Sequence, residues 1–359
     1  MRGFLAVVVL LAAAVQAAIE PDVKDALVRN LRFSSSEIAD LQKGKVVKHG
    51  VEASAPGELA VVGAVRVQAP VERLIESVRQ ITDFKRGPDV MQIGRFSDPP
   101  VLEDLAPLTI TKEDFDASSC RVGDCSVRLP ADAIRRLPAE VDSSGPDAQA
   151  RAAAWFKQVI FDDVRAYWTK APGRFEQYDD DSVPVRPIDD FNELVKSTPS
   201  VAALVPMLPK HLLEFPSERI EGSEDFLYWS KEKFGIAPFV TVTHVTIICR
   251  TTRSCIVATK DVYSSRYLDA SLSLTIASGD TANQNAFYLI YLNRSRSSAL
   301  KGFLSGLRKS IAERRARSSL DETLKSLKAR LEKPAPKHEA AGLSPHFSWV
   351  DRPVAVNKY

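Results

Sequence analysis

In the first two thirds of the chain, a strand-like run is followed by segments whose apolar residues recur at helical spacing. Residues 58–69 form a strand-like run that ends at Pro70, and the apolar residues that follow recur at helical spacing over 71–81. A second apolar stripe at helical spacing covers about 147–170 and stops at Pro172 and Gly173. The sequence therefore predicts a strand, an amphipathic helix and then a helical block.

Shorter elements complete this part of the chain. We expect a short helix near 34–41, a strand at 90–96, and helices at about 189–196 and 201–215. Residues 138–147 have the composition of a linker.

From Pro238 onward the apolar period changes to two. The predicted strands are 239–249, 255–263, 268–276 and 286–293, and the first two read as a hairpin joined by RTTRS. A helical stretch follows at about 297–333. The pattern predicts an α+β fold, in which an antiparallel sheet packs on a long C-terminal helix and an additional helical block is present.

The C-terminal helical stretch has two apolar faces. At about 100° per residue the first four apolar positions lie nearly opposite the last four. The two sets are Leu300, Leu304, Leu307 and Ile311, and Leu320, Leu324, Leu327 and Leu331. Because 319–322 also has a capping-box pattern, we expect two helices or one sharply kinked helix.

The amino terminus has the order of a secretory signal peptide. Arg2 precedes an uncharged apolar run over 4–15, and small residues follow at Ala17 and Ala18. The apolar run is short for a membrane span. We therefore expect a periplasmic or secreted protein. The expected segments are a signal peptide (1–18), an entry arm (19–57), a first α+β part (58–137), a helical insertion or subdomain (138–225), the sheet and terminal helices (226–333) and a flexible tail (334–359).

The four cysteines form two close pairs, Cys120 with Cys125 and Cys249 with Cys255. An even count at short spacing in an exported protein indicates two local disulfides. A zinc site built from both pairs and free thiols are the alternatives, although the spacers are longer than those usual for zinc.

The net charge and the absence of common motifs exclude several classes of function. A net charge of +2 lacks the basic excess that nucleic-acid binding needs, so we expect no nucleic-acid partner. The common catalytic signatures and phosphate-binding loops are absent, and no cofactor or metal is expected. His244 is interpreted as a histidine packed on a sheet. Convergence of His244, Tyr263 and Asp269 in one cleft would favour an enzyme.

Two clusters each have two interpretations. The basic cluster that includes Arg308, Lys309, Arg314 and Arg315 is either a solvated helix face or a surface for anionic lipid headgroups. The aromatic block with Phe226, Tyr228 and Trp229 either seals the sheet edge or lies at the mouth of an apolar cavity.

The order of elements resembles that of START-like (helix-grip) lipid-binding domains. The resemblance covers about 58–96 and 226–331 and depends on element order, not on a residue motif. It implies a curved sheet that wraps the last helix and encloses an apolar cavity for a lipid.

The leading hypothesis is an exported binding or carrier protein for an apolar, lipid-like ligand held between the sheet and the terminal helix. Alternatives are a structural or partner-binding envelope protein and an enzyme without a recognisable signature. The expected ligand-binding residues are Phe226, Tyr228, Trp229, Leu268, Leu272, Leu274, Leu300, Phe303, Leu304 and Leu307.

Overall fold

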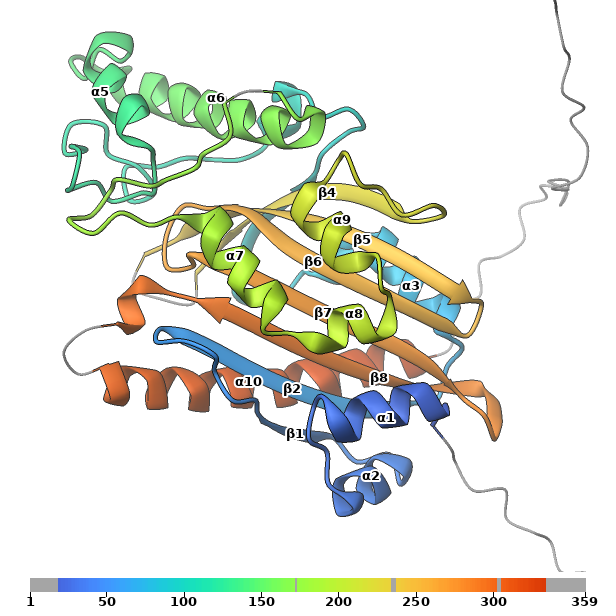
Figure 1. Cartoon of the computed structure of the whole chain (residues 1–359). Coiled ribbons are helices and arrows are strands. Elements are labelled where there is room, and N and C mark those ends of the chain that lie inside the picture. Colours follow the sequence, from blue (N-terminus) through green and yellow to red (C-terminus); the bar gives the residue numbers. More distant parts are fainter. Residues whose placement is uncertain (1–18, 172, 234–236, 302–304, 334–359) are drawn as a thin grey trace, which may run out of the picture.

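The computed structural model describes residues 19–171, 173–233, 237–301 and 305–333, and its centre is an eight-stranded sheet (Figure 1). The strand order is β1-β2-β8-β7-β6-β5-β4-β3, and the neighbouring strands are antiparallel. The strands are β1 (Val47–Gly50), β2 (Glu58–Val67), β3 (Val90–Arg95), β4 (Glu224–Glu232), β5 (Phe239–Thr251), β6 (Ser254–Ser264), β7 (Ala270–Asp280) and β8 (Asn283–Arg296).

Helices lie before, between and after these strands. They are α1 (Pro21–Arg29), α2 (Ser35–Gln42), α3 (Val71–Arg79), α4 (Ile81–Phe84), α5 (Ala131–Glu140), α6 (Ala148–Thr169), α7 (Pro187–Lys196), α8 (Pro199–Leu204), α9 (Leu208–Glu214) and α10 (Ser305–Glu332), with the 3-10 helices η1 (Leu102–Leu105) and η2 (Ser298–Leu300). The α+β class predicted from the sequence is therefore correct. No helix in the described part of the chain is long and apolar enough to cross a membrane.

In the sequence, the long helical block lies between two strands that are neighbours in the sheet. β3 and β4 are antiparallel neighbours, although residues 96–223 separate them in the sequence. At the other end of the chain path, β8 pairs with β2, so the last strand lies beside an early one. The helical block therefore does not interrupt the sheet, because β3 before it and β4 after it are paired.

Different helices cover the two faces of the sheet. On one face, side chains such as Val62 and Leu292 pack with α1, α2, α7, α8 and α9. On the other face, side chains such as Val65 and Leu289 pack with α3 and α10. We call these the α7 face and the α10 face; in Figure 1, α7 and α8 lie in front of the sheet and α10 lies behind it. A further cluster joins α5 and α6 to β4, β5 and β6.

α10 is one uninterrupted helix, so the prediction of two helices or a sharp kink is wrong. Leu320 and Leu324 are buried against the sheet, whereas Ile311 is 48% exposed. In the part of α10 whose side chains are described, Ile311 of the first apolar set thus lies in solvent, and the capping-box pattern at 319–322 lies inside the helix.

Two other segments differ from the expected structure. The aromatic block forms strand β4, and its backbone pairs with β5 in regular antiparallel register. Residues 19–57 contain α1, α2 and β1, and Leu27, Leu31 and Leu41 are buried in the core of the α7 face. The capping box of α2 at Ser34 matches the short helix expected there.

Both predicted disulfides are present. Cys120 and Cys125 have Cα atoms 4.2 Å apart, and those of Cys249 and Cys255 are 4.0 Å apart. The second pair joins β5 to β6 directly across the hairpin, where the two residues are register partners. Two disulfides agree with an exported protein. The proposed signal peptide and tail lie outside the described residues.

Candidate functional site

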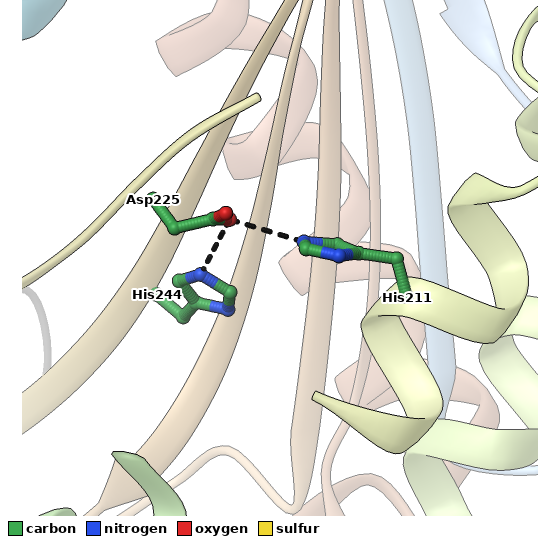
Figure 2. A group of neighbouring side chains, drawn as sticks. All are labelled: His211, Asp225 and His244. Atoms are coloured by element: carbon green, nitrogen blue, oxygen red, sulfur yellow. Dashed lines mark hydrogen bonds and ion pairs between the residues drawn. The ribbon is translucent and has the colours of Figure 1, made fainter. Parts of the chain in front are cut away.

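Two histidines and one aspartate meet in the interior between α9, β4 and β5 (Figure 2). Nε2 of His211 and Nε2 of His244 each lie 3.0 Å from the same atom, Oδ1 of Asp225. The side chains of His211, Asp225 and His244 are 1%, 4% and 0% exposed. We call this group the His-Asp-His centre.

Regular strand geometry places most of the centre. Asp225 on β4 is the direct register partner of Thr246 on β5, and His244 is two residues earlier, so all three side chains share one face. α9 packs on that face and adds His211. The hydroxyl of Thr246 donates to Oδ1 of Asp225 at 2.7 Å.

Every side chain of the centre has an outer hydrogen-bond partner. Nδ1 of His211 lies 2.8 Å from the carbonyl oxygen of Glu218, and Nδ1 of His244 lies 2.8 Å from the hydroxyl of Tyr167. The hydroxyl of Ser223 donates to the other oxygen of Asp225 at 2.9 Å. These contacts fix the ring orientations, so the three side chains form a preorganised group.

The electrostatics of the centre favour an ionised Asp225. Burial raises the pKa of the Asp225 carboxyl, but hydrogen bonds from His211 and His244 outweigh this and hold the pKa well below its usual range. Burial lowers the pKa of His244, against the effect of Asp225. Lys260 lies opposite His244 on β6, and burial lowers its pKa to about 7.

Comparisons with known proteins give no assignment. No family model, curated protein or solved structure matches the chain.

The apolar residues expected to line a cavity are divided between the two faces of the sheet. Leu272 and Leu274 on β7 are buried in the core of the α7 face, on the opposite side from α10. Leu320 and Leu324 of α10 belong to the core of the other face. Leu272 and Leu274 therefore do not lie between the sheet and α10.

The aromatic block is divided in the same way. Phe226 and Tyr228 lie on the α10 face, each 5% exposed, while Trp229 points to the opposite face and donates from Nε1 to the carbonyl oxygen of Asp104 at 2.9 Å. Alternation along a strand separates Trp229 from its neighbour Tyr228.

Of the remaining expected ligand residues, the side chains of two lie in the described part of the chain. Leu268 and Leu300 are half-buried. Phe303 and Leu304, and the side chain of Leu307, lie outside the described residues. In the basic cluster, Arg314 and Arg315 are exposed on α10, while the side chains of Arg308 and Lys309 are outside the described part.

The α10 face carries polar side chains on its interior strands. Thr259, Ser273 and Asn293 are consecutive register partners across β6, β7 and β8, and Thr275 pairs with Tyr291. We call these residues, together with Asp261 and Ser271, the polar patch. Except for Ser273, they are partly exposed, although their strands are flanked on both sides. Hydrogen bonds link several of them, including Ser273 to Tyr291 at 3.1 Å and Asn293 to Ser273 at 2.9 Å.

Asp261 is the acidic member of the polar patch. Burial raises its pKa to about 7, while the hydrogen bond from Thr243, at 3.0 Å, and the charge of Lys85 act in the opposite direction. The patch therefore contains a carboxyl group that exchanges its proton near neutral pH, beside a lysine.

Two hollows are found on other parts of the molecule. One, of about 800 Å³, is bordered by charged side chains of both signs, including Arg128, Asp180, Arg296 and Lys301. The other, of about 520 Å³, lies against α5 and α6. Neither is lined by any of the residues expected to bind an apolar ligand.

The three residues considered for catalysis do not converge. The hydroxyl of Tyr263 donates to the carbonyl oxygen of Arg128, and Asp269 forms an ion pair with the same arginine. His244 instead contacts Tyr167 and Asp225. This arrangement does not support the enzyme hypothesis.

Sequence analysis missed His211 and Asp225 as partners of His244. The available signal was local: His244 and Thr246 alternate on one predicted strand, so both must point to the same face.

Proposed function

We propose that this chain is an exported binding protein that holds a lipid-like ligand against the α10 face of its sheet. The observation that carries the proposal is the partial exposure of the polar patch in the middle of a wide sheet. An antiparallel sheet can leave part of one face in solvent, and the opposite face here is covered by α7, α8 and α9. The uncovered part therefore provides surface for another molecule.

The order of elements supports the same proposal. β2 is followed by α3 and α4, antiparallel strands follow, and α10 is the last helix. α10 packs along β2 at one side of the α10 face, and α3 contacts β6 and β7. This order is that expected from the resemblance to START-like domains, with residues 96–223 inserted between β3 and β4.

The chemistry of the face favours an amphipathic ligand. In the patch itself, Tyr291 presents a partly buried aromatic ring, whereas the neighbouring Val245, Val257 and Leu289 are at most 5% exposed and belong to the core of the α10 face. Hydroxyl, amide and carboxyl groups of the patch can pair with a polar head. The exposed chemistry of the patch therefore suits the head group of an amphipathic ligand, with the ring of Tyr291 as its apolar contact.

Contact with a membrane belongs to the same proposal. Arg314 and Arg315 are exposed on α10, the helix that borders the ligand face. Basic side chains near an anionic lipid surface contribute about 1 kcal/mol each. These two arginines would hold the ligand face close to a membrane, which is the source of a lipid-like ligand.

Native mass spectrometry and solvent extraction of protein from its own host test the proposal. Wild-type protein should carry a lipid-like molecule, and Thr275→Trp should lose it because the indole fills the polar patch. Thr251→Trp, at an exposed strand end, is the matched control and should retain the ligand. Recovery of no lipid-like molecule from folded wild-type protein would refute the proposal.

A further inference from the structure

The hydrogen bonds of the His-Asp-His centre require a positive charge beside Asp225. A carbonyl oxygen can only accept, so the Nδ1 of His211 that faces Glu218 carries a hydrogen. In a neutral ring, Nε2 of His211 then has a lone pair, and this lone pair faces the carboxylate oxygen of Asp225 at 3.0 Å. Either a second proton or a metal ion must lie between them.

The hydroxyl of Thr246 does not remove this requirement. It lies 2.7 Å from Oδ1 of Asp225 and 3.1 Å from Nε2 of His211, but it has only one hydrogen to donate. If the Thr246 hydroxyl donates to Nε2 of His211, no hydrogen is left between its oxygen and Oδ1 of Asp225, and the two oxygens repel each other. His244 needs no such correction, because Tyr167 can donate to its Nδ1 while its Nε2 donates to Asp225.

The donor atoms have the composition and arrangement of a transition-metal site. Two imidazole nitrogens and one carboxylate oxygen are a donor set that zinc accepts, and the three atoms lie within 4.8 Å of one another. Zinc bonds of about 2.0–2.1 Å place neighbouring ligands roughly 3.3 Å apart in a tetrahedral site. The two nitrogen–oxygen separations of 3.0 Å are close to this value, and the two imidazole nitrogens lie within 4.8 Å of each other.

The outer hydrogen bonds fit metal binding equally well. The contact of His211 with Glu218 leaves its Nε2 free to coordinate, and His244 does the same when its Nδ1 donates to Tyr167. Ser223 holds the second oxygen of Asp225, so its first oxygen remains available. Partners of this kind orient the ligands in protein metal sites.

We propose that His211, Asp225 and His244 bind one divalent transition-metal ion of the zinc class, which joins α9 to strands β4 and β5. The hydroxyl oxygen of Thr246 is a fourth potential ligand atom within reach. Because the three side chains are at least 96% buried, the ion has a structural role and no position open to substrate. The site is independent of the ligand proposed on the α10 face.

Metal content and cobalt substitution test this site in the full chain. After dialysis against a weak chelator, wild-type protein should take up one equivalent of Zn²⁺ and show the visible bands of a low-symmetry Co²⁺ site. Asp225→Asn, His211→Gln and His244→Gln should each weaken zinc binding at least tenfold, in keeping with the loss of a ligand.

Two controls exclude other histidines. His49→Gln changes a half-buried histidine outside the centre, and the double substitution His338→Gln with His346→Gln removes those of the C-terminal tail. Both proteins should bind Zn²⁺ as the wild type does. Equal binding by Asp225→Asn or His211→Gln would overturn the proposal.

A spectroscopic measurement on wild-type protein covers the case in which these variants do not fold. Nitrogen NMR of the histidine rings should show Nε2 of His211 and His244 without hydrogen once Zn²⁺ is added. A doubly protonated His211 that is unchanged by Zn²⁺ would overturn the proposal, because a proton would then occupy the position assigned to the metal.

Discussion

The packing of α10 on β2 makes a strong prediction at Gly63. A methyl group at this position would lie 2.7 Å from Cδ1 of Leu324 and 3.0 Å from Cδ2 of Leu320. Ordinary contacts between carbon atoms are about 3.5–4.0 Å, so Gly63→Ala must displace α10 or the sheet. The substitution therefore tests whether α10 packs on the sheet as described.

The magnitude follows from two opposing effects. Overpacking a core by one methylene costs about 1–3 kcal/mol, and replacing a glycine restricts the unfolded chain, which stabilises by about 0.4–1 kcal/mol. We expect Gly63→Ala to lower the free energy of unfolding by about 1–2 kcal/mol. Leu324→Ala alone should lower it by about 2–5 kcal/mol, since Leu324 is 1% exposed.

Combining the substitutions isolates the contact. In the Leu324→Ala background the closest contact is removed while that with Leu320 at 3.0 Å remains, so Gly63→Ala should become less destabilising, with a coupling energy of about 1 kcal/mol. Gly50→Ala is the control, because its methyl group would lie 3.7 Å from Nη1 of Arg317. Urea denaturation with both disulfides intact gives the free energies. Equal effects of Gly63→Ala in both backgrounds would refute the described packing.

Three further predictions concern buried charge, the hairpin disulfide and pH. Glu58→Ala leaves the buried Arg294 without its carboxylate partner at 2.8 Å and should cost about 3–5 kcal/mol in urea denaturation, against at most about 0.5 kcal/mol for the exposed Glu52→Ala. Replacing Cys249 and Cys255 by serine should lower the free energy of unfolding by about 2 kcal/mol for this short loop, and no change would contradict the chain-entropy argument. The pKa of Asp261 is raised from 3.8 to about 7, so its contribution to stability is complete below about pH 4 and is lost as pH rises through about 7. Denaturation across this range should show the wild type losing stability relative to Asp261→Asn, and parallel profiles would contradict it.

Local periodicity was sufficient for most strands of the sheet, although not for β1 and β4. The strands expected at 58–69, 239–249, 255–263 and 286–293 correspond to β2, β5, β6 and β8, because each combines an apolar pattern with a clear boundary. The hairpin disulfide followed from the same pattern, since cysteines that flank a short turn become register partners.

The strand β4 and the exposure of Ile311 depend on tertiary contacts, which local periodicity does not reveal. The aromatic residues of 224–232 have no clean alternation, because both faces of β4 are buried and apolar residues occupy both. The helical pattern near Ile311 indicated an interface, yet that side chain is exposed. An apolar stripe identifies a helix face, but not whether another element covers it.

The His-Asp-His centre was beyond sequence reasoning for a related cause. Its members are separated by 14 and 19 residues and come from a short helix and two strands. Only the packing of α9 onto the α7 face brings His211 to Asp225, and no spacing rule encodes that contact.

The two proposed sites are separated by the sheet itself. Thr243 and His244 are consecutive on β5, and alternation points Thr243 to Asp261 on the α10 face and His244 to Asp225 on the α7 face. A metal ion bound to Asp225 and His244 would join β4 to β5 from one side and thereby hold Thr243 and Tyr228 in place on the other. The two sites share this backbone but no side chain. Thr275→Trp should therefore remove the lipid and leave zinc binding intact, whereas Asp225→Asn should remove the metal and affect lipid binding only through the stability of β4 and β5.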